Sequence, residues 1–125
     1  MSVRSPLAAW RLSLYCAAFG FTVLALLPVD RLPPVPLFNW WDKAQHALAF
    51  GVLTLLARLG WPKGSAWRQA LGLVGYGVLI EVTQAATGWR HGEVADALAD
   101  AAGVMAGLGV VALWGACLKV RREGS

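Results

Sequence analysis

The sequence predicts an all-α protein, a four-helix transmembrane bundle whose N- and C-termini are cytoplasmic. Of its 125 residues, 58% are hydrophobic and only 14% are charged, a composition too apolar for an ordinary soluble domain. Four apolar stretches also approach the roughly 20 residues that span a hydrocarbon core. They are residues 7–27, 41–60, 67–87 and 94–118. We therefore expect residues 1–125 to form a single membrane domain.

The first stretch, residues 7–27, is expected to be a retained membrane helix. Ser5 is the expected N-cap, and Pro6 suits the first helical position. The apolar run is long for a signal peptide, and no small-x-small cleavage site precedes Pro28. The proline-rich segment from Pro28 to Pro36 cannot continue a helix, so we expect it to run extended over the outer surface and cap the outer mouth.

The remaining stretches are joined by short connections, which favour antiparallel neighbours. The turn from Pro62 to Ser65 joins residues 41–60 to residues 67–87, and residues 88–92 join the latter to the last stretch. That last stretch carries small residues at steps of four, which let another backbone approach closely. They are Ala95, Ala99, Gly103 and Gly107. We favour a partner helix in the same chain, while a homo-oligomer formed through these residues stays open.

The distribution of Lys and Arg predicts the orientation, because cytoplasmic segments of inner-membrane proteins are enriched in both. With four crossings, most basic residues fall on one side: Arg4, Arg11, Arg58, Lys63, Arg68, Lys119, Arg121 and Arg122. The other side receives Arg31, Lys43 and Arg90. We therefore place both termini in the cytoplasm and the protein in the inner (cytoplasmic) membrane. The net charge of +4 then reflects attraction to anionic lipid headgroups, with no nucleic acid as partner.

Polar and ionisable side chains occur near the outer ends of three predicted spans and in the connection beside them. They are Asp42, Lys43, His46, Glu81, Gln84, Arg90, Asp96 and Asp100. At a rise of 1.5 Å per residue, His46, Glu81 and Asp100 lie roughly 7, 9 and 10 Å from the outer ends of their helices. Because these depths nearly coincide, we expect the side chains to converge in one outward-facing pocket.

The cost of burying charge favours such a grouping. An ionised carboxylate at this depth costs about 2.5–3.5 kcal/mol unless it is paired, hydrated or protonated. Grouped carboxylates can pair with Arg90, Lys43 and His46, or two of them can share a proton. Intramembrane ionisable groups of this kind indicate a functional site.

A structural explanation competes with the functional one. Arg90 and Asp96 could belong to a buried ion-pair clasp that only fixes the helix register. Taken singly, Asp42 could be the N-cap of its helix, and His91 and Glu93 solvated loop groups. We favour a binding pocket because the number of hydrogen-bonding groups exceeds the two or three that a clasp needs.

An ordered set of motifs covers roughly residues 40–110: Asp42-Lys43-x-x-His46-x-x-x-Phe50, Glu81-x-x-Gln84, Arg90, Asp96 and Gly103-x-x-x-Gly107. This set resembles the VanZ-like family of small bacterial membrane proteins, named after a member tied to resistance against the glycopeptide antibiotic teicoplanin. The resemblance implies a small helical membrane protein and leaves its biochemical activity open. Asp100 stands where the family usually has Asn, which adds a charge to the pocket.

Our main functional prediction is a binding module. The pocket would hold an envelope lipid or a glycopeptide-related ligand, and the binding would influence sensitivity to teicoplanin-type antibiotics. Arg90 and Lys43 would face phosphate or carboxylate groups of the ligand. Glu81, Gln84 and Asp96 would face its amides or hydroxyls.

The alternative is a membrane-embedded enzyme acting on a lipid-linked envelope substrate. Glu81 or Asp100 would then be the general base and His46 its acid partner, or these three with Asp96 would hold a divalent metal. The sequence contains no paired-His motif, no nucleophile–base pair and no phosphate-cradling glycine loop. We therefore lean away from catalysis and predict neither a metal nor another cofactor. A transporter is disfavoured because the inner helix halves are apolar.

Overall fold

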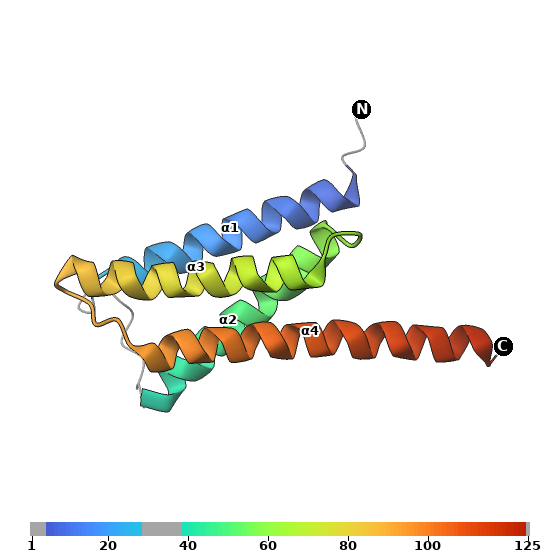
Figure 1. Ribbon diagram of the computed structural model, residues 1–125. Coiled ribbons are helices and arrows are strands. Elements are labelled where there is room, and N and C mark those ends of the chain that lie inside the picture. The colour runs from blue at the N-terminus through green and yellow to red at the C-terminus, as the bar shows by residue number, and fades with distance from the viewer. Residues whose placement is uncertain (1–4, 29–38, 125) are drawn as a thin grey trace.

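The computed structural model describes residues 5–28 and 39–124, and this part of the chain is all-α. Four helices follow one another (Figure 1): α1 (Pro6–Leu26), α2 (Asn39–Gly60), α3 (Ala66–Thr87) and α4 (Val94–Glu123). The all-α class and the four helices are confirmed, with bounds close to the expected ones except that α4 continues past residue 118. The extended segment expected over residues 28–36 lies outside the described residues from position 29 onward.

The helix ends follow from local sequence. The Ser5 hydroxyl accepts a hydrogen bond from the N–H of Ala8 at 3.3 Å, and the Ser65 hydroxyl accepts one from the N–H of Arg68 at 3.4 Å. Both serines act as N-caps, which satisfy N–H groups that lack a partner within the helix. Helix α3 ends at Thr87 and is capped by Gly88, whose φ of 80° lies in the left-handed region that favours glycine.

Three of the described helices are long and apolar enough to cross a membrane: α1, α3 and α4. Helix α2 has a similar length but does not reach the same apolar character, since Asp42, Lys43, Gln45 and His46 lie near its start. The chain is therefore a multi-pass membrane protein with three candidate spans. A fourth crossing by α2 stays a prediction.

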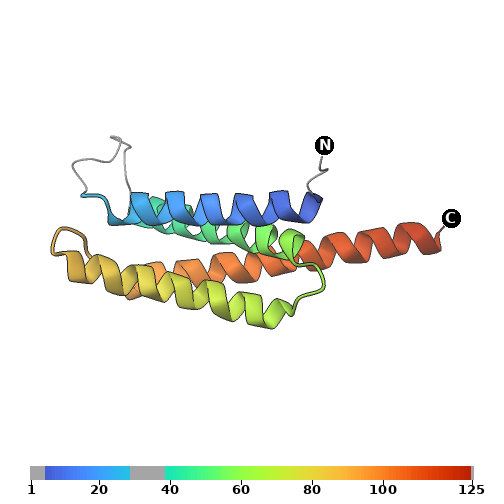
Figure 2. The same cartoon turned by 90° about the horizontal axis from the view of Figure 1, so that it is seen from above.

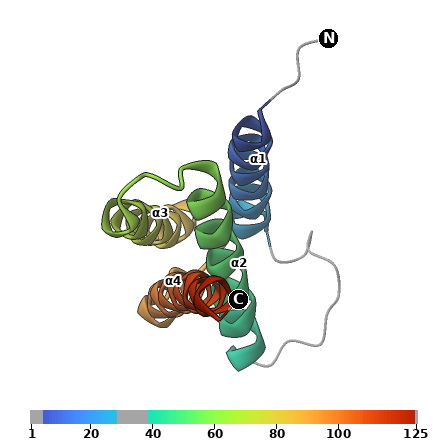
Figure 3. The same ribbon diagram turned by 90° about the vertical axis from the view of Figure 1, so that its right-hand side faces the viewer.

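Helix α2 occupies the centre of the bundle (Figure 3). It packs most extensively against α4 and also contacts α1 and α3. The start of α1, the turn between α2 and α3 and the end of α4 lie at one end, which α4 overshoots (Figures 1 and 2). The connection between α3 and α4 lies at the other end together with the start of α2. This arrangement gathers the N-terminal ends of α2 and α4 beside the C-terminal end of α3.

The apolar core is small and lies around Phe50. This side chain is 0% exposed and packs with Leu53, Ala70 and Val104. Many large apolar side chains instead cover the outer faces, including the exposed Leu113 of α4. Exposed apolar surface on this scale is unusual for a soluble protein and suits contact with lipid.

The two glycines of the small-residue stripe of α4 face α2. A Cβ added at Gly103 would clash with the backbone carbonyl of Ala47, and one added at Gly107 would lie 2.8 Å from the Cβ of Thr54. The partner of these two glycines is thus a helix of the same chain, as we favoured. Ala95 of the stripe is exposed, so a homo-oligomer formed through the stripe stays a prediction.

Candidate functional site

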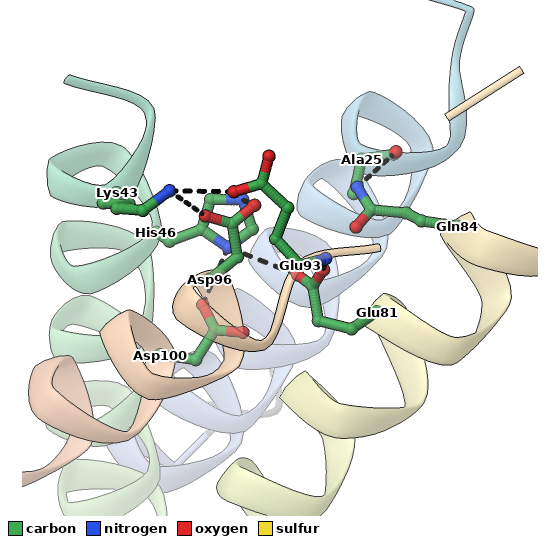
Figure 4. Close-up of polar contacts among 8 residues, drawn as sticks. All are labelled: Ala25, Lys43, His46, Glu81, Gln84, Glu93, Asp96 and Asp100. Atoms are coloured by element: carbon green, nitrogen blue, oxygen red, sulfur yellow. Dashed lines mark hydrogen bonds and ion pairs between the residues drawn. The ribbon is translucent and has the colours of Figure 1, made fainter. Parts of the chain in front are cut away.

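Polar side chains from α2, α3 and α4 meet at the end of the bundle that holds the α3–α4 connection (Figure 4). We call this set the polar cluster. Its members are Asp42, Lys43, His46, Glu81, Glu93, Asp96 and Asp100. Six of these seven residues were candidates from the sequence; Glu93 was not.

His46 is the centre of the polar cluster. Its Nδ1 lies 2.8 Å from Asp100 Oδ1 and 3.9 Å from Glu81 Oε1, and its Nε2 lies 4.0 Å from Asp96 Oδ2. All four side chains are buried, and Asp100 is 0% exposed. The ring of Phe21 packs edge-on against the imidazole, with 5.4 Å between ring centres. The similar depths expected for His46, Glu81 and Asp100 therefore correspond to a cluster of side chains from three helices.

Lys43 and Glu93 form the outer rim of the polar cluster. The Lys43 ammonium donates to Glu93 Oε2 at 3.0 Å and to Asp96 Oδ1 at 3.2 Å. The Lys43 and Glu93 side chains are 32% and 54% exposed, whereas that of Asp96 is buried. Lys43 and Glu93 therefore lie between the buried Asp96 carboxylate and the exposed surface of the protein.

Asp42 lies within the first turn of α2, because that helix begins at Asn39. The alternative that Asp42 is the N-cap is therefore wrong. Its carboxylate, the His46 imidazole and the Asp96 carboxylate each offer one atom within 4.8 Å of the others. The N-terminal ends of α2 and α4 meet here, and their positive dipole ends offset part of the negative charge.

Glu93 is the residue that sequence reasoning missed. It was expected to be a solvated loop group, but its N–H donates to Glu81 Oε2 at 2.9 Å and its carboxylate binds Lys43. Gly92 allows this return of the chain, because a Cβ there would clash with the backbone carbonyl of Glu81. The sequence feature that could have identified Glu93 as part of the site is its position immediately before α4, three residues from Asp96.

Gln84 and Arg90 stand apart from the polar cluster. Gln84 Nε2 donates to the carbonyl of Ala25 in α1 at 2.8 Å, so this amide joins α3 to α1 (Figure 4). The backbone N–H of Arg90 donates to the Thr87 hydroxyl at 3.2 Å. Within residues 5–28 and 39–124, the Arg90 guanidinium forms no ion pair with a carboxylate, so the competing explanation of a clasp between Arg90 and Asp96 is wrong.

Two oxygens of the polar cluster are buried without a hydrogen-bond partner in the described part of the chain. They are Glu81 Oε1 and Asp100 Oδ2. A closed structural clasp would satisfy its own acceptors, because a buried polar atom without a partner costs about 1–3 kcal/mol. The polar cluster instead retains acceptors for a proton, a hydrogen-bond donor or a cation.

An apolar groove of about 310 Å³ runs along α1 and α2 next to the polar cluster. Its lining residues are Ala17, Phe21, Gln45, Leu48, Ala49, Val52 and Leu53. Phe21 belongs to the groove on one side and contacts His46 on the other. The open volume thus lies beside the buried carboxylates, whereas the sequence predicted an open pocket between them.

The fold and the polar cluster together define a class: a multi-pass helical membrane protein with a buried, mostly acidic group of side chains at one end. The chain matches the VanZ/LLP1 family model over residues 8–115 and belongs to this family. The match confirms the resemblance carried by the motifs and extends it into α1. No curated protein and no solved structure matches the chain.

Proposed function

We propose that the polar cluster binds the headgroup of a cell-envelope lipid and that this binding changes sensitivity to teicoplanin-type antibiotics. The observation that carries the proposal is the excess of carboxylates over cations in the cluster. Five carboxylates face Lys43 and His46, and Lys43 is already held by Glu93 and Asp96. An acidic group of this composition attracts cations and hydrogen-bond donors and repels anions.

The ligand group that fits is therefore a primary amine. The sequence suggested that Lys43 and Arg90 would face a phosphate. Lys43 instead binds two carboxylates, and Arg90 forms no ion pair with the cluster within the described residues. An ammonium group carries one positive charge and three N–H donors, which match the surplus of carboxylate acceptors in the polar cluster.

The apolar groove supplies the second half of the proposed site. Its lining is almost entirely apolar, and Gln45 at one end lies between Lys43 and His46 along α2. A lipid whose headgroup contacts the rim would have an acyl chain at this position, in the hydrocarbon region. The occupant we assign to the groove is this acyl chain. Burial of apolar surface adds affinity that is independent of the headgroup.

The proposed orientation places the polar cluster at the outer surface of the inner membrane. Arg11, Arg58 and Lys63 lie at the opposite end of the bundle with the start of α1, and Arg121 and Arg122 lie at the end of α4. This bias supports cytoplasmic termini by the positive-inside rule. Lipid-linked wall precursors, the targets of glycopeptides, are exposed on the outer side.

We expect phosphatidylethanolamine to bind more tightly than phosphatidylglycerol or phosphatidylcholine, because phosphatidylglycerol is anionic and choline lacks N–H donors. Asp96→Asn should weaken phosphatidylethanolamine binding about tenfold, the effect of losing one charge-assisted hydrogen bond. Fluorescent lipid analogues titrated into the full chain in nanodiscs measure this. Glu123→Gln, which removes an exposed carboxylate at the other end of the bundle, should bind like wild type. Equal affinity of Asp96→Asn and wild type would overturn the proposed headgroup site.

The antibiotic role has its own test. In a strain lacking the gene, restoring the wild-type chain is expected to change the teicoplanin concentration that inhibits growth, and restoring Asp96→Asn is expected not to. Glu123→Gln is again the matched control, with membrane levels of each protein compared by immunoblot. If wild type and Asp96→Asn restore the same susceptibility, the cluster has no part in the antibiotic effect.

A second candidate, catalysis on a lipid-linked substrate, is favoured by the contact between His46 and Asp100. A carboxylate 2.8 Å from Nδ1 holds the imidazole in one orientation, as in general acid–base sites. Conversion of the bound lipid during the binding measurement, detected by chromatography, would favour this candidate over simple binding.

A further inference from the structure

Beneath the rim, three buried side chains from three different helices offer metal-ligating atoms. His46 comes from α2, Glu81 from α3 and Asp100 from α4, and one atom of each lies within 4.8 Å of the other two. The His46 Nδ1 is 2.8 Å from Asp100 Oδ1 and 3.9 Å from Glu81 Oε1. We call these residues the buried triad.

The buried triad has oxygen atoms that no other group uses. Glu81 is 7% exposed and Asp100 is 0% exposed, and Glu81 Oε1 and Asp100 Oδ2 have no hydrogen-bond partner in the described part of the chain. The nearest lysine does not reach them, because the Lys43 ammonium is held at the rim by Glu93 and Asp96. Two carboxylates in a buried position need compensating positive charge or protons.

We propose that the buried triad binds one divalent first-row metal ion, with Zn²⁺ or Mn²⁺ as the chemically suited species. One imidazole nitrogen and carboxylate oxygens are ligands that both ions accept. Two carboxylates, one neutral imidazole and a dication give an assembly with no net charge, which removes most of the cost of burying the carboxylates. Three protein ligands also leave a coordination position free, as in catalytic zinc sites.

The distances within the triad are compatible with this role. Ligand atoms about 2.0–2.2 Å from one zinc ion in tetrahedral geometry lie about 3.4 Å apart. The two separations measured from His46 Nδ1, 2.8 and 3.9 Å, fall on either side of that value. Small side-chain movements would therefore suffice for coordination.

The surroundings of the triad orient its ligands. The N–H of Glu93 donates to Glu81 Oε2 at 2.9 Å, which fixes this carboxylate with its other oxygen toward His46. Metal-ligating carboxylates are commonly held by such hydrogen bonds. The Phe21 ring against the imidazole restricts its rotation and excludes lipid from that side. The sequence lacked a paired-His spacing because the three ligands come from three helices.

The test uses the full chain without an affinity tag, purified in detergent and dialysed against a chelator. Zn²⁺ and Mn²⁺ are then titrated in separately, and bound metal is measured by elemental analysis after gel filtration. We expect about one ion per chain, with Glu81→Gln weakening the binding more than tenfold because it removes an anionic ligand. Glu123→Gln should bind like wild type. Absence of bound metal in the wild type, or equal binding by Glu81→Gln and wild type, would overturn the proposal.

A spectroscopic measurement keeps the test valid if Glu81→Gln does not fold. Co²⁺ added to the chelated wild type should give visible absorption bands of a low-symmetry site with nitrogen and oxygen ligands. A spectrum identical to that of hydrated Co²⁺ would contradict the site. The proposed metal site goes beyond lipid binding, and the two are separable: phosphatidylethanolamine binding measured with chelator present reports on the rim alone.

Discussion

Gly103→Ala is expected to destabilise the bundle by about 1–3 kcal/mol or more, the range for forcing extra atoms into a packed contact. The added Cβ would clash with the carbonyl oxygen of Ala47 and approach its Cα at 2.8 Å. These are backbone atoms, so a change of rotamer cannot relieve the clash, and α2 and α4 must separate. Thermal unfolding of the purified protein in detergent, followed by Trp fluorescence, measures the loss.

Gly109→Ala is the matched control for this prediction. Gly109 lies in the same helix, and a Cβ there would meet nothing within 4 Å. Because alanine favours a helix over glycine, this variant should be as stable as wild type or slightly more stable. Equal unfolding temperatures for Gly103→Ala and Gly109→Ala would contradict the close contact between α2 and α4.

The same contact bears on the polar cluster. Gly103 lies less than one helical turn after Asp100, and Ala47 directly follows His46. The close approach of the two backbones therefore sets the distance between the imidazole and the carboxylate. The glycine contact that packs α4 against α2 therefore also positions His46 and Asp100 of the polar cluster.

Much of the fold could be predicted from the sequence because its determinants are local. The apolar stretches set the helices, and Ser5 and Pro6 mark the start of α1 as expected. The spacing of glycines in α4 indicated a packing face. The choice of α2 as the main partner of α4 could not be read from connection lengths, because it depends on which faces fit together in three dimensions.

Only part of the site could be predicted, because helix rise gives depth along the axis but not direction around it. Glu81 and Gln84 lie three residues apart on α3, yet Glu81 contacts His46 while Gln84 reaches the Ala25 carbonyl of α1. A rotation of about 60° between such positions is enough to direct them to different neighbours. The role of Glu93 depends on how the α3–α4 connection folds back, which no periodicity encodes.

His46→Leu is expected to cost about 3–5 kcal/mol of stability, the range for removing one partner of a buried ion pair. The substitution keeps an apolar surface against Phe21 but leaves both Asp100 oxygens without a partner, in a position that is 0% exposed. Unfolding in detergent with a chelator present measures the loss without any contribution from metal.

The double variant of His46→Leu with Asp100→Asn tests whether the loss of stability in His46→Leu comes from the unpaired Asp100 carboxylate. Adding Asp100→Asn to His46→Leu removes the buried charge without changing the side-chain size, and Asn is what the VanZ-like family usually carries at this position. We therefore expect the double variant to regain a substantial part of the stability, since an unpaired amide costs less to bury than an unpaired carboxylate. If the two substitutions simply add, the His46–Asp100 contact contributes no coupling energy, and α2 and α4 must be held together at this level by other contacts, such as the Lys43–Asp96 ion pair and the packing at Gly103.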